Sequence, residues 1–379
     1  MKVSGQWLER AETQKVCTAL RDAGWQALPV GGCVRNALLG VPVADVDIAT
    51  DARPETVSDL AKKAGFKVVP TGIEHGTVTV IAGGVPYEIT TFRRDVETDG
   101  RRAVVAFSDR LEDDAARRDF TMNALYALPD GTVIDPLGGI ADLKARRVRF
   151  VGDAGTRIRE DYLRILRFFR FHAWYGDSGA GLDADGLAAC AELSAGIETL
   201  SSERLGAEMR KLLAAADPAP AVAAMAQAGV LRQVLPGADH RALAPLVHLE
   251  EGAGPRWLRR LVVLGAEDAA GRLRLSRAEA KALAAVTNAA QVGGSAAVLG
   301  WQLGAESAAD AVLARAAMTG AAPAADWQEE VARGAAVRFP VKAADLPGLQ
   351  GAALGKRLKA LQSRWLDSGL RLTKADLLD

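Results

Sequence analysis

Two aspartates near the start of the chain have the type and spacing of metal ligands. Asp45 and Asp47 flank Val46 in "ADVDIA", and alternate residues of a strand point to the same face. Two carboxylates that close repel each other unless a cation neutralises them, and Mg²⁺ is bound by one or two carboxylates together with substrate phosphates. The pair therefore predicts a magnesium site, although an Asp-x-Asp on its own more often marks a solvated strand face.

A glycine pair precedes these aspartates. Gly31-Gly32 follows an apolar run that ends at Val30, and "VRNALLG" continues as a short helix. Backbone N–H groups at a helix start bind anions, and Arg35 in the first turn can reach a phosphate. A plain strand–turn–helix would show the same glycines. The glycine pair followed by the Asp pair is the more specific pattern, and it predicts a phosphate cradle beside a metal site.

A third carboxylate, Glu88, lies within the apolar stretch "VPYEITTF". It either completes the acidic cluster as a catalytic residue or is an exposed residue of an edge strand, and the sequence favours neither. Three carboxylates, a metal and a phosphate cradle predict phosphoryl or nucleotidyl transfer. In that chemistry one metal ion lowers the pKa of the attacking hydroxyl and another holds the triphosphate and the leaving pyrophosphate, while positioning and charge stabilisation carry most of the catalysis.

The elements that must position these residues change in type near residue 150. Before that point, helical stretches such as "PETVSDLAKKAG" alternate with short β-branched runs, which indicates an α+β region. Beyond about residue 155, apolar residues recur at helical spacing and we expect only helices. The expected strands are "VDIAT", "FKVVP", "GTVTVI", "YEITTF", "AVVAF", "TVID" and "RVRFV".

The length, composition and net charge of the chain exclude several classes of protein. The chain has 379 residues, which suggests more than one domain, and it shows no run of 18 apolar residues and no signal peptide. Its three cysteines (Cys17, Cys33 and Cys190) are far apart, so we expect no disulfide framework or zinc site and a cytoplasmic location. Formal net charge is zero, so any nucleic-acid surface must be local.

Five motifs in this order resemble those of the class II tRNA nucleotidyltransferase and poly(A) polymerase family, the CCA-adding enzymes. They are "GGCVRNALLG…DVDIAT", "EITTFRRD", "RRDFTMNALYAL", "IDPLGGIADL" and "REDYLRILRFFRF". The resemblance implies an α+β nucleotidyltransferase head with a mixed or antiparallel sheet at 1–140. It also implies an all-α remainder, with a base-selecting neck at 141–213 and a tRNA-binding body and tail at 214–379.

The resemblance also assigns roles to individual residues. It implies that Gly31, Gly32, Arg35 and Arg118 bind the nucleotide, with Gly32 and Arg35 at its triphosphate, and that Asp45 and Asp47 hold Mg²⁺. One departure is Asn36, which stands where the family usually has Asp. An amide still forms hydrogen bonds but carries no charge.

A third constellation lies in "EDYLRILRFFR", where Glu160, Asp161, Arg164, Arg167 and Arg170 follow one another at helical spacing. On a helix they would form one continuous face, although an ordinary amphipathic helix with a surface ion pair has the same spacing. Cytosine and adenine both present an amine donor beside a ring-nitrogen acceptor, which a carboxylate and a guanidinium can match, whereas uracil and guanine present the reverse. The resemblance implies that Asp161 and Arg164 select CTP and ATP without a template, and that Arg167 and Arg170 contact the nucleotide.

Two further features concern the RNA. The charged segment between Phe92 and Asp119, with Gly100 at a turn, is expected to be a surface loop, and the resemblance implies a flexible loop needed to add the terminal A. Basic stretches at 256–260, 271–281 and 355–365 are candidate RNA contacts. For any one of them, an ordinary amphipathic helix surface is the more common explanation.

The sequence thus predicts a template-independent enzyme that builds or repairs the 3′-terminal CCA of tRNA from CTP and ATP with Mg²⁺, with no membrane partner. A poly(A) polymerase of the same family, or an enzyme that adds only C or only A, is the nearest alternative. An RNA-binding protein without catalysis is favoured slightly by Asn36 and opposed by the intact Asp pair. A nucleotidyltransferase for small molecules would not need the long helical part.

Overall fold

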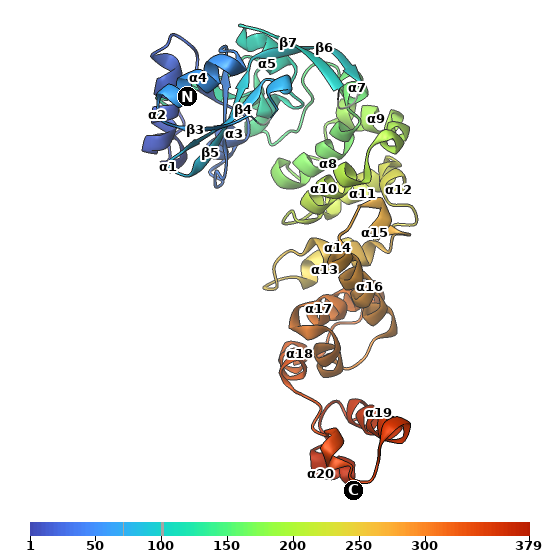
Figure 1. Ribbon diagram of the computed structural model, residues 1–379. Helices are drawn as coiled ribbons and strands as arrows, with labels where there is room; N and C mark the ends of the chain where they lie inside the picture. The colour runs from blue at the N-terminus through green and yellow to red at the C-terminus, as the bar shows by residue number, and fades with distance from the viewer. Residues whose placement is uncertain (71, 100–101) are drawn as a thin grey trace. The chain divides into compact units, whose positions relative to one another are not determined.

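The computed structural model describes residues 1–70, 72–99 and 102–379, with the backbone alone for residues 95–99 and 102–105. The chain forms two compact units (Figure 1). The first comprises Met1–Leu200 with Ala228–Val230, and the second comprises Ser201–Gln227 with Leu231–Asp379. The finer division at residues 140 and 213 stays a prediction.

A mixed five-stranded sheet forms the centre of the first unit, with strand order β1-β2-β5-β4-β3. The strands are β1 (Leu28–Pro29), β2 (Val46–Thr50), β3 (Lys67–Val69), β4 (Thr77–Ala82) and β5 (Val85–Thr91). Strand β2 runs parallel to β5, while the other neighbouring pairs are antiparallel. This confirms the mixed sheet expected from the sequence.

The two faces of this sheet differ in burial. Val46, Ile48 and Tyr87 are buried on one face, where the Tyr87 hydroxyl lies 3.0 Å from the Thr13 hydroxyl of helix α2 (Ala11–Arg21). Asp47 and Glu88 alternate with them and are exposed. Because β5 lies between β2 and β4, Glu88 is in a central strand, and the interpretation of it as an edge-strand residue is wrong.

The helices that surround the sheet follow the sequence signals closely. Glycine begins α3 (Gly32–Leu39) and ends it at Gly40, which has φ 68°. Proline occupies the start of α4 (Pro54–Lys63), as expected. The other helices of this part are α1 (Gln6–Glu9), α5 (Leu111–Ala116) and α6 (Gly139–Lys144), with short 3-10 turns at Ile73–His75 and Thr121–Asn123.

The expectation of a loop between Phe92 and Asp119 is wrong over most of the segment, whereas the strand expected at "AVVAF" is confirmed. Strands β6 (Arg93–Asp99) and β7 (Arg102–Phe107) form an antiparallel pair, and α5 follows. The turn expected at Gly100 lies outside the described residues. A second two-stranded sheet pairs β8 (Tyr126–Ala127) with β9 (Val133–Ile134). The strand expected at "RVRFV" is absent from the described chain, where Phe150 makes only an isolated bridge to Phe120.

Helix α8 (Leu163–Tyr175) is anchored by aromatic rings. Phe168 stacks on Phe150 with ring centroids 5.5 Å apart, and Phe171 lies 4.9 Å from Phe120. Before it, α7 (Ala154–Glu160) ends at Asp161, which is extended with φ −157°. The prediction of one continuous helix from Glu160 to Arg170 is therefore wrong. The remaining helices of this unit are α9 (Ala184–Glu192) and a 3-10 turn at Ser194–Thr199.

The described part of the second unit is helical, as expected. Its longer helices are α10 (Ser202–Leu213), α11 (Ala219–Gln227), α14 (Trp257–Leu264), α16 (Arg277–Val292), α17 (Ala296–Thr319), α18 (Trp327–Ala336) and α19 (Gly351–Asp367). Shorter ones are α12 (Val230–Val234), α13 (Leu243–Leu249), α15 (Ala269–Arg272), a 3-10 turn at Ala343–Asp345 and α20 (Lys374–Leu378). Gly334 lets α18 approach α17 so closely that a Cβ there would collide with the Ala297 carbonyl. Among the described residues, no helix has both the length and the apolar character needed to cross a bilayer.

Candidate nucleotide-binding site

The Gly31-Gly32 turn lies directly beside Asp47. The Val30 N–H donates to the Asp47 carbonyl at 2.9 Å, so the end of the apolar run is tied to β2. Gly31 has φ 69° and ψ −116°, a conformation that is readily open to glycine alone. The turn thus places the first N–H groups of α3 next to the strand that carries Asp47, as the sequence predicted.

Two guanidinium groups flank this turn. A Cβ placed on Gly31 would lie 3.3 Å from Nη1 of Arg118, and one placed on Gly32 would lie 3.7 Å from Nη2 of Arg35. Both glycines therefore leave room for an arginine against the backbone. The structure brings together these four residues, which the resemblance predicts to bind the nucleotide, although they are as many as 87 positions apart in sequence.

Two of the carboxylates lie side by side on the exposed face of the sheet. Asp47 lies directly opposite Glu88 in the parallel pair of β2 and β5, whereas Asp45 immediately precedes β2 and is not in the strand predicted to carry it. Loss of hydration around its carboxyl, followed by the negative charge of Glu88, raises the pKa of Asp47 to about 6, while Arg118 acts in the opposite direction. This mutual repulsion is what a bound cation would relieve.

The carboxylates fit a metal that is completed by its substrate. No cluster of three or more His, Cys, Asp or Glu side chains suited to a metal ion occurs in the described part of the chain. Mg²⁺ usually takes one or two protein carboxylates and fills its other positions with water and phosphate oxygens. Asp45 and Asp47 match that donor set, and Glu88 lies beside Asp47 in register.

Arg118 is held by a buried carboxylate. Asp114 Oδ2 accepts from Nη2 of Arg118 at 2.9 Å and from the Tyr126 hydroxyl at 2.7 Å, and Asp114 Oδ1 accepts from Arg117. Burial alone would lower the pKa of Arg118, but the Asp114 charge outweighs it and raises the pKa above its usual range. Arg118 is thus a fixed, charge-paired cation beside Gly31.

Arg35 is held in a different way. Its Nε and Nη2 donate to the Asn36 side-chain oxygen at 3.1 and 2.9 Å, Nη1 donates to the Asn123 side-chain oxygen at 2.5 Å, and Nη2 donates to the Tyr175 hydroxyl at 2.8 Å. The guanidinium also lies 4.0 Å from the centroid of the Tyr175 ring. Only 6% of the residue is exposed, and burial lowers the pKa of Arg35.

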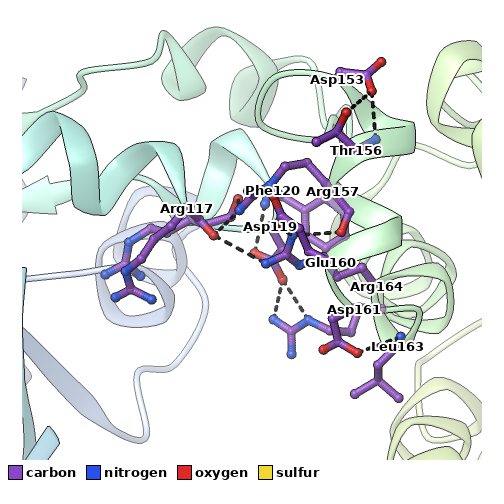
Figure 2. Close-up of polar contacts among 12 residues, drawn as sticks. Arg117, Asp119, Phe120, Asp153, Thr156, Arg157, Glu160, Asp161, Leu163 and Arg164 are labelled. Atoms are coloured by element: carbon purple, nitrogen blue, oxygen red, sulfur yellow. Dashed lines mark hydrogen bonds and ion pairs between the residues drawn. The ribbon is translucent and has the colours of Figure 1, made fainter. Parts of the chain in front are cut away.

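Figure 2 shows how the break between α7 and α8 arranges the residues expected to read the base. The Asp161 carboxylate accepts from the Leu163 N–H at 3.1 Å, so Asp161 caps the start of α8 rather than continuing a helix. Arg164 donates to Glu160 at 2.5 Å and to the Arg157 carbonyl at 2.9 Å. Glu160, and not Asp161, therefore supplies the carboxylate that Arg164 binds.

Arg167 contacts a residue that the site prediction did not include. Its Nε donates to Asp119 at 2.7 Å, and Asp119 also accepts from the Asn123 amide at 2.9 Å. Burial alone would raise the pKa of Asp119, but the Arg167 charge and these donors lower it to about 2. Since Asn123 also binds Arg35, a polar chain joins α8 to α3. The other predicted contact, Arg170, lies on α8 with its guanidinium 4.5 Å from the Phe171 ring centroid.

Sequence reasoning missed Asp114, Asp119, Asn123 and Tyr175 as partners of the site arginines. Asp119 and Asn123 lie within the quoted motif "RRDFTMNALYAL", so their position in it was a usable signal. Asp114 was concealed in a segment expected to be a loop. Nothing in the sequence around Tyr175 indicated a contact with α3.

The candidate RNA contacts in the second unit separate into two kinds. Arg259 and Arg260 of "RWLRR" are 2% and 1% exposed, so their interpretation as RNA contacts is wrong. They bind the buried carboxylates of Glu250 and Asp310. By contrast, Lys356, Arg357 and Lys359 on α19 and Arg277 and Lys281 on α16 are exposed.

Comparisons with family models match two segments of the chain. Residues 27–149 match "Poly A polymerase head domain", and residues 181–241 match "Probable RNA and SrmB- binding site of polymerase A". The first segment contains the glycine pair and all three carboxylates.

Curated relatives and solved structures agree with these models. A CCA-adding enzyme of Streptococcus pyogenes serotype M2 is 47% identical over 203 residues, covering 53% of this chain and 48% of the relative. The human CCA tRNA nucleotidyltransferase 1, mitochondrial, is 44% identical over 184 residues, covering 48% and 42%. These matches span about half the length of the curated relatives.

The solved structures extend the likeness to nearly the whole chain. The Bacillus stearothermophilus CCA-adding enzyme in complex with CTP is 31% identical, has a TM-score of 0.74, and is matched over 94% of this chain and 92% of that one. The Thermotoga maritima CCA-adding enzyme complexed with tRNA is 20% identical with a TM-score of 0.70, and is matched over 100% and 97%. At that identity the second likeness concerns the fold alone.

Proposed function

Because the chain belongs to the family of CCA-adding tRNA nucleotidyltransferases and poly(A) polymerases, we propose that it builds or repairs the 3′-terminal CCA of tRNA from CTP and ATP. The observation that carries the proposal is the glycine turn flanked by Arg35 and Arg118 next to the opposed Asp47 and Glu88. This arrangement offers donors for a triphosphate beside acceptors for a metal. The match to a relative solved with CTP extends over nearly the whole chain, which supports the same reading.

We assign metal binding to Asp45 and Asp47, with Glu88 in support. A divalent ion held there, Mg²⁺ by the chemistry of its oxygen ligands, would polarise the 3′-hydroxyl and offset charge on the triphosphate. The chain's own contribution is positional. The N–H groups at the start of α3 and the two flanking guanidinium groups would orient the triphosphate, so that the 3′-hydroxyl displaces pyrophosphate from the α-phosphorus.

Selection of the base is assigned to Asp161 and Arg164. The carboxylate accepts from an exocyclic amine and the guanidinium donates to a ring nitrogen, which matches cytosine and adenine. Nε of Arg164 donates no hydrogen bond among the described residues, and it is therefore the donor offered to the base. Glu160 and the Arg157 carbonyl accept from Nη1 of that guanidinium, and the Arg117 carbonyl accepts from Nη2 at 3.5 Å. Arg167 and Arg170 follow on the same helix.

Contact with tRNA is assigned to the exposed basic residues of the helical unit. Lys356, Arg357 and Lys359 lie within four residues of α19 and are suited to phosphates. A cytoplasmic location is also part of the proposal, and the free thiols of Cys17, Cys33 and Cys190 fit a reducing compartment.

The experiment that tests this function is an incorporation assay. The protein, Mg²⁺ and tRNA lacking its CCA end are incubated with each labelled nucleotide separately, and then with CTP and ATP together. We expect two additions of C, then one of A, and then a stop. Extension with ATP alone and without a stop would instead identify a poly(A) polymerase, and addition of C alone a partial enzyme. Binding of tRNA without any incorporation would contradict catalysis.

A further inference from the structure

Asn36 is the residue at which this chain departs from the pattern that it otherwise resembles, and the structure gives it two hydrogen-bonding tasks. Its side-chain oxygen accepts from two N–H groups of Arg35, at 2.9 and 3.1 Å. Its side-chain nitrogen donates to the Pro42 carbonyl at 3.1 Å. One end must accept and the other must donate, and an amide satisfies both. A carboxylate would place a second oxygen against the Pro42 carbonyl.

The charge balance around Arg35 is the second observation. Neighbouring arginines of the site contact a carboxylate, and these are Arg117, Arg118, Arg157, Arg164 and Arg167. The hydrogen-bond acceptors of Arg35 are all neutral, being two amide oxygens and a phenol. Asp119, whose charge acts on Arg35, is itself bound by Arg167. Among the described residues, Arg35 is therefore a buried cation with no carboxylate bound to it.

The position of this cation is the third observation. Nη2 of Arg35 lies behind Gly32, 3.7 Å from where a Cβ would stand, and Gly32 is the first residue of α3. An anion bound by the N–H groups of the glycine turn would thus lie close to the Arg35 charge. In surroundings that exclude water, such an attraction is stronger than at the surface.

We propose that Asn36 is a positioning residue that fixes the Arg35 guanidinium without neutralising it, so that its full charge attracts the triphosphate and the product pyrophosphate. The inference rests on the proposed function and concerns the anion subsite of that same site. Asp at this position would keep an acceptor for Arg35 but cancel its charge and lose the hydrogen bond to Pro42.

The test compares Asn36→Asp with Asn36→Leu in the full-length protein. Both variants lose the hydrogen bond to Pro42, but only Asn36→Asp adds a negative charge beside Arg35. Binding of inorganic pyrophosphate is measured by calorimetry in metal-free buffer, and thermal unfolding is measured in parallel. We expect Asn36→Asp to weaken pyrophosphate binding roughly tenfold. Asn36→Leu should weaken it by less than about threefold, because Asn123 and Tyr175 still hold the charged guanidinium of Arg35.

The variant with the weaker pyrophosphate binding is expected to be the more stable of the two. Asn36→Leu leaves two Arg35 N–H groups unpaired and is expected to melt at the lower temperature, while Asn36→Asp retains that contact. A purely structural role would rank the variants identically in both measurements, and that result overturns the inference. Equal pyrophosphate affinity in wild type and Asn36→Asp, or no binding by wild type, also overturns it. Incorporation of CTP by wild type is scored separately, so that loss of the proposed function is recognised independently.

Discussion

A pair of arginines in the second unit and one arginine in the first are similarly buried, but the charges of the groups around them differ. Arg259 and Arg260 of α14 are 2% and 1% exposed, and Arg35 of α3 is 6% exposed. The α14 pair faces two buried carboxylates, Glu250 and Asp310, so its charges are balanced within the protein. The acceptors around Arg35 are neutral, and the residue borders a glycine turn.

The difference separates an arginine that supports the fold from one that we propose binds a ligand. A buried cation paired with carboxylates and carbonyl oxygens is satisfied, and removing it leaves an uncompensated charge. A buried cation with neutral partners keeps a charge that is not balanced within the protein, and it therefore attracts an anionic ligand. Both groups appear simply as basic residues in the sequence. Partners that are distant in sequence decide which role each one has.

The largest expected effect is the loss of nucleotide incorporation when a carboxylate of the candidate site beside Arg35 is changed. Asp47→Asn removes a charge from an exposed strand position, so the fold is retained while metal binding is lost. We expect the rate of CTP incorporation under single-turnover conditions to fall by roughly 10³-fold or more. The matched control is Asp59→Asn, an exposed aspartate on α4. Wild-type rates in Asp47→Asn would remove Asp47 from the site.

The next effect concerns the structural arginines. Arg260→Met breaks contacts to Glu250 and to the carbonyls of Leu213 and Ala216. We expect the free energy of unfolding to fall by about 3 kcal/mol, as measured by urea denaturation, with CTP affinity unchanged. Arg241→Met, which removes an exposed pair with Asp239, should change it by less than about 1 kcal/mol. Loss of tRNA affinity without loss of stability would restore the RNA-contact interpretation of Arg260.

A smaller effect is expected on base selection. Asp161→Asn keeps an oxygen that can cap α8 through the Leu163 N–H, but it adds an amide donor where the base amine must donate. We expect the ratio of CTP to UTP incorporation to fall about tenfold, as measured by kcat/KM for each nucleotide. Asp185→Asn on α9 is the control. An unchanged ratio would move base selection away from Asp161.

The smallest expected effect is on thermal stability, which we expect the charge of Asp47 in the candidate site to lower. The pKa of Asp47 is raised to about 6 from an ordinary value of 3.8, so the folded protein binds this proton more tightly than the unfolded chain does. The carboxylate therefore opposes folding above pH 6, and the penalty disappears as the pH falls toward 4. In metal-free buffer, Asp47→Asn should raise the melting temperature by about 1–2 °C at pH 7.5 and leave it unchanged at pH 4. A larger rise in melting temperature at pH 4 than at pH 7.5 would contradict this account.

The sequence predicted the parts of the site that depend on local pattern. Gly31-Gly32, the start of α3 and the alternation around Asp47 follow from turn and strand rules, and the structure has them as expected. The sequence left open whether Glu88 joins the acidic cluster, because its position opposite Asp47 depends on strand order, which the sequence did not show.

The remainder depended on contacts between distant residues. At the helix break, Asp161 is extended and its side chain accepts from the Leu163 N–H, a local bond that competes with an otherwise intact helical periodicity. The burial of Arg259 depends on Asp310, 51 residues away. The neutral surroundings of Arg35 depend on Tyr175, which is 140 residues away. Such pairings are fixed by packing and not by local spacing.

The measurement that tests the central claim most directly is hydrogen–deuterium exchange of the full-length protein with and without CTP and Mg²⁺. The account predicts protection at the glycine turn and α3, around Arg117 to Asp119, and at the start of α8. It predicts no change in α14 or α17, where the arginine charges are already satisfied. Protection confined to α14 and α17, with none at the glycine turn, would contradict the assignment of the two groups of arginines.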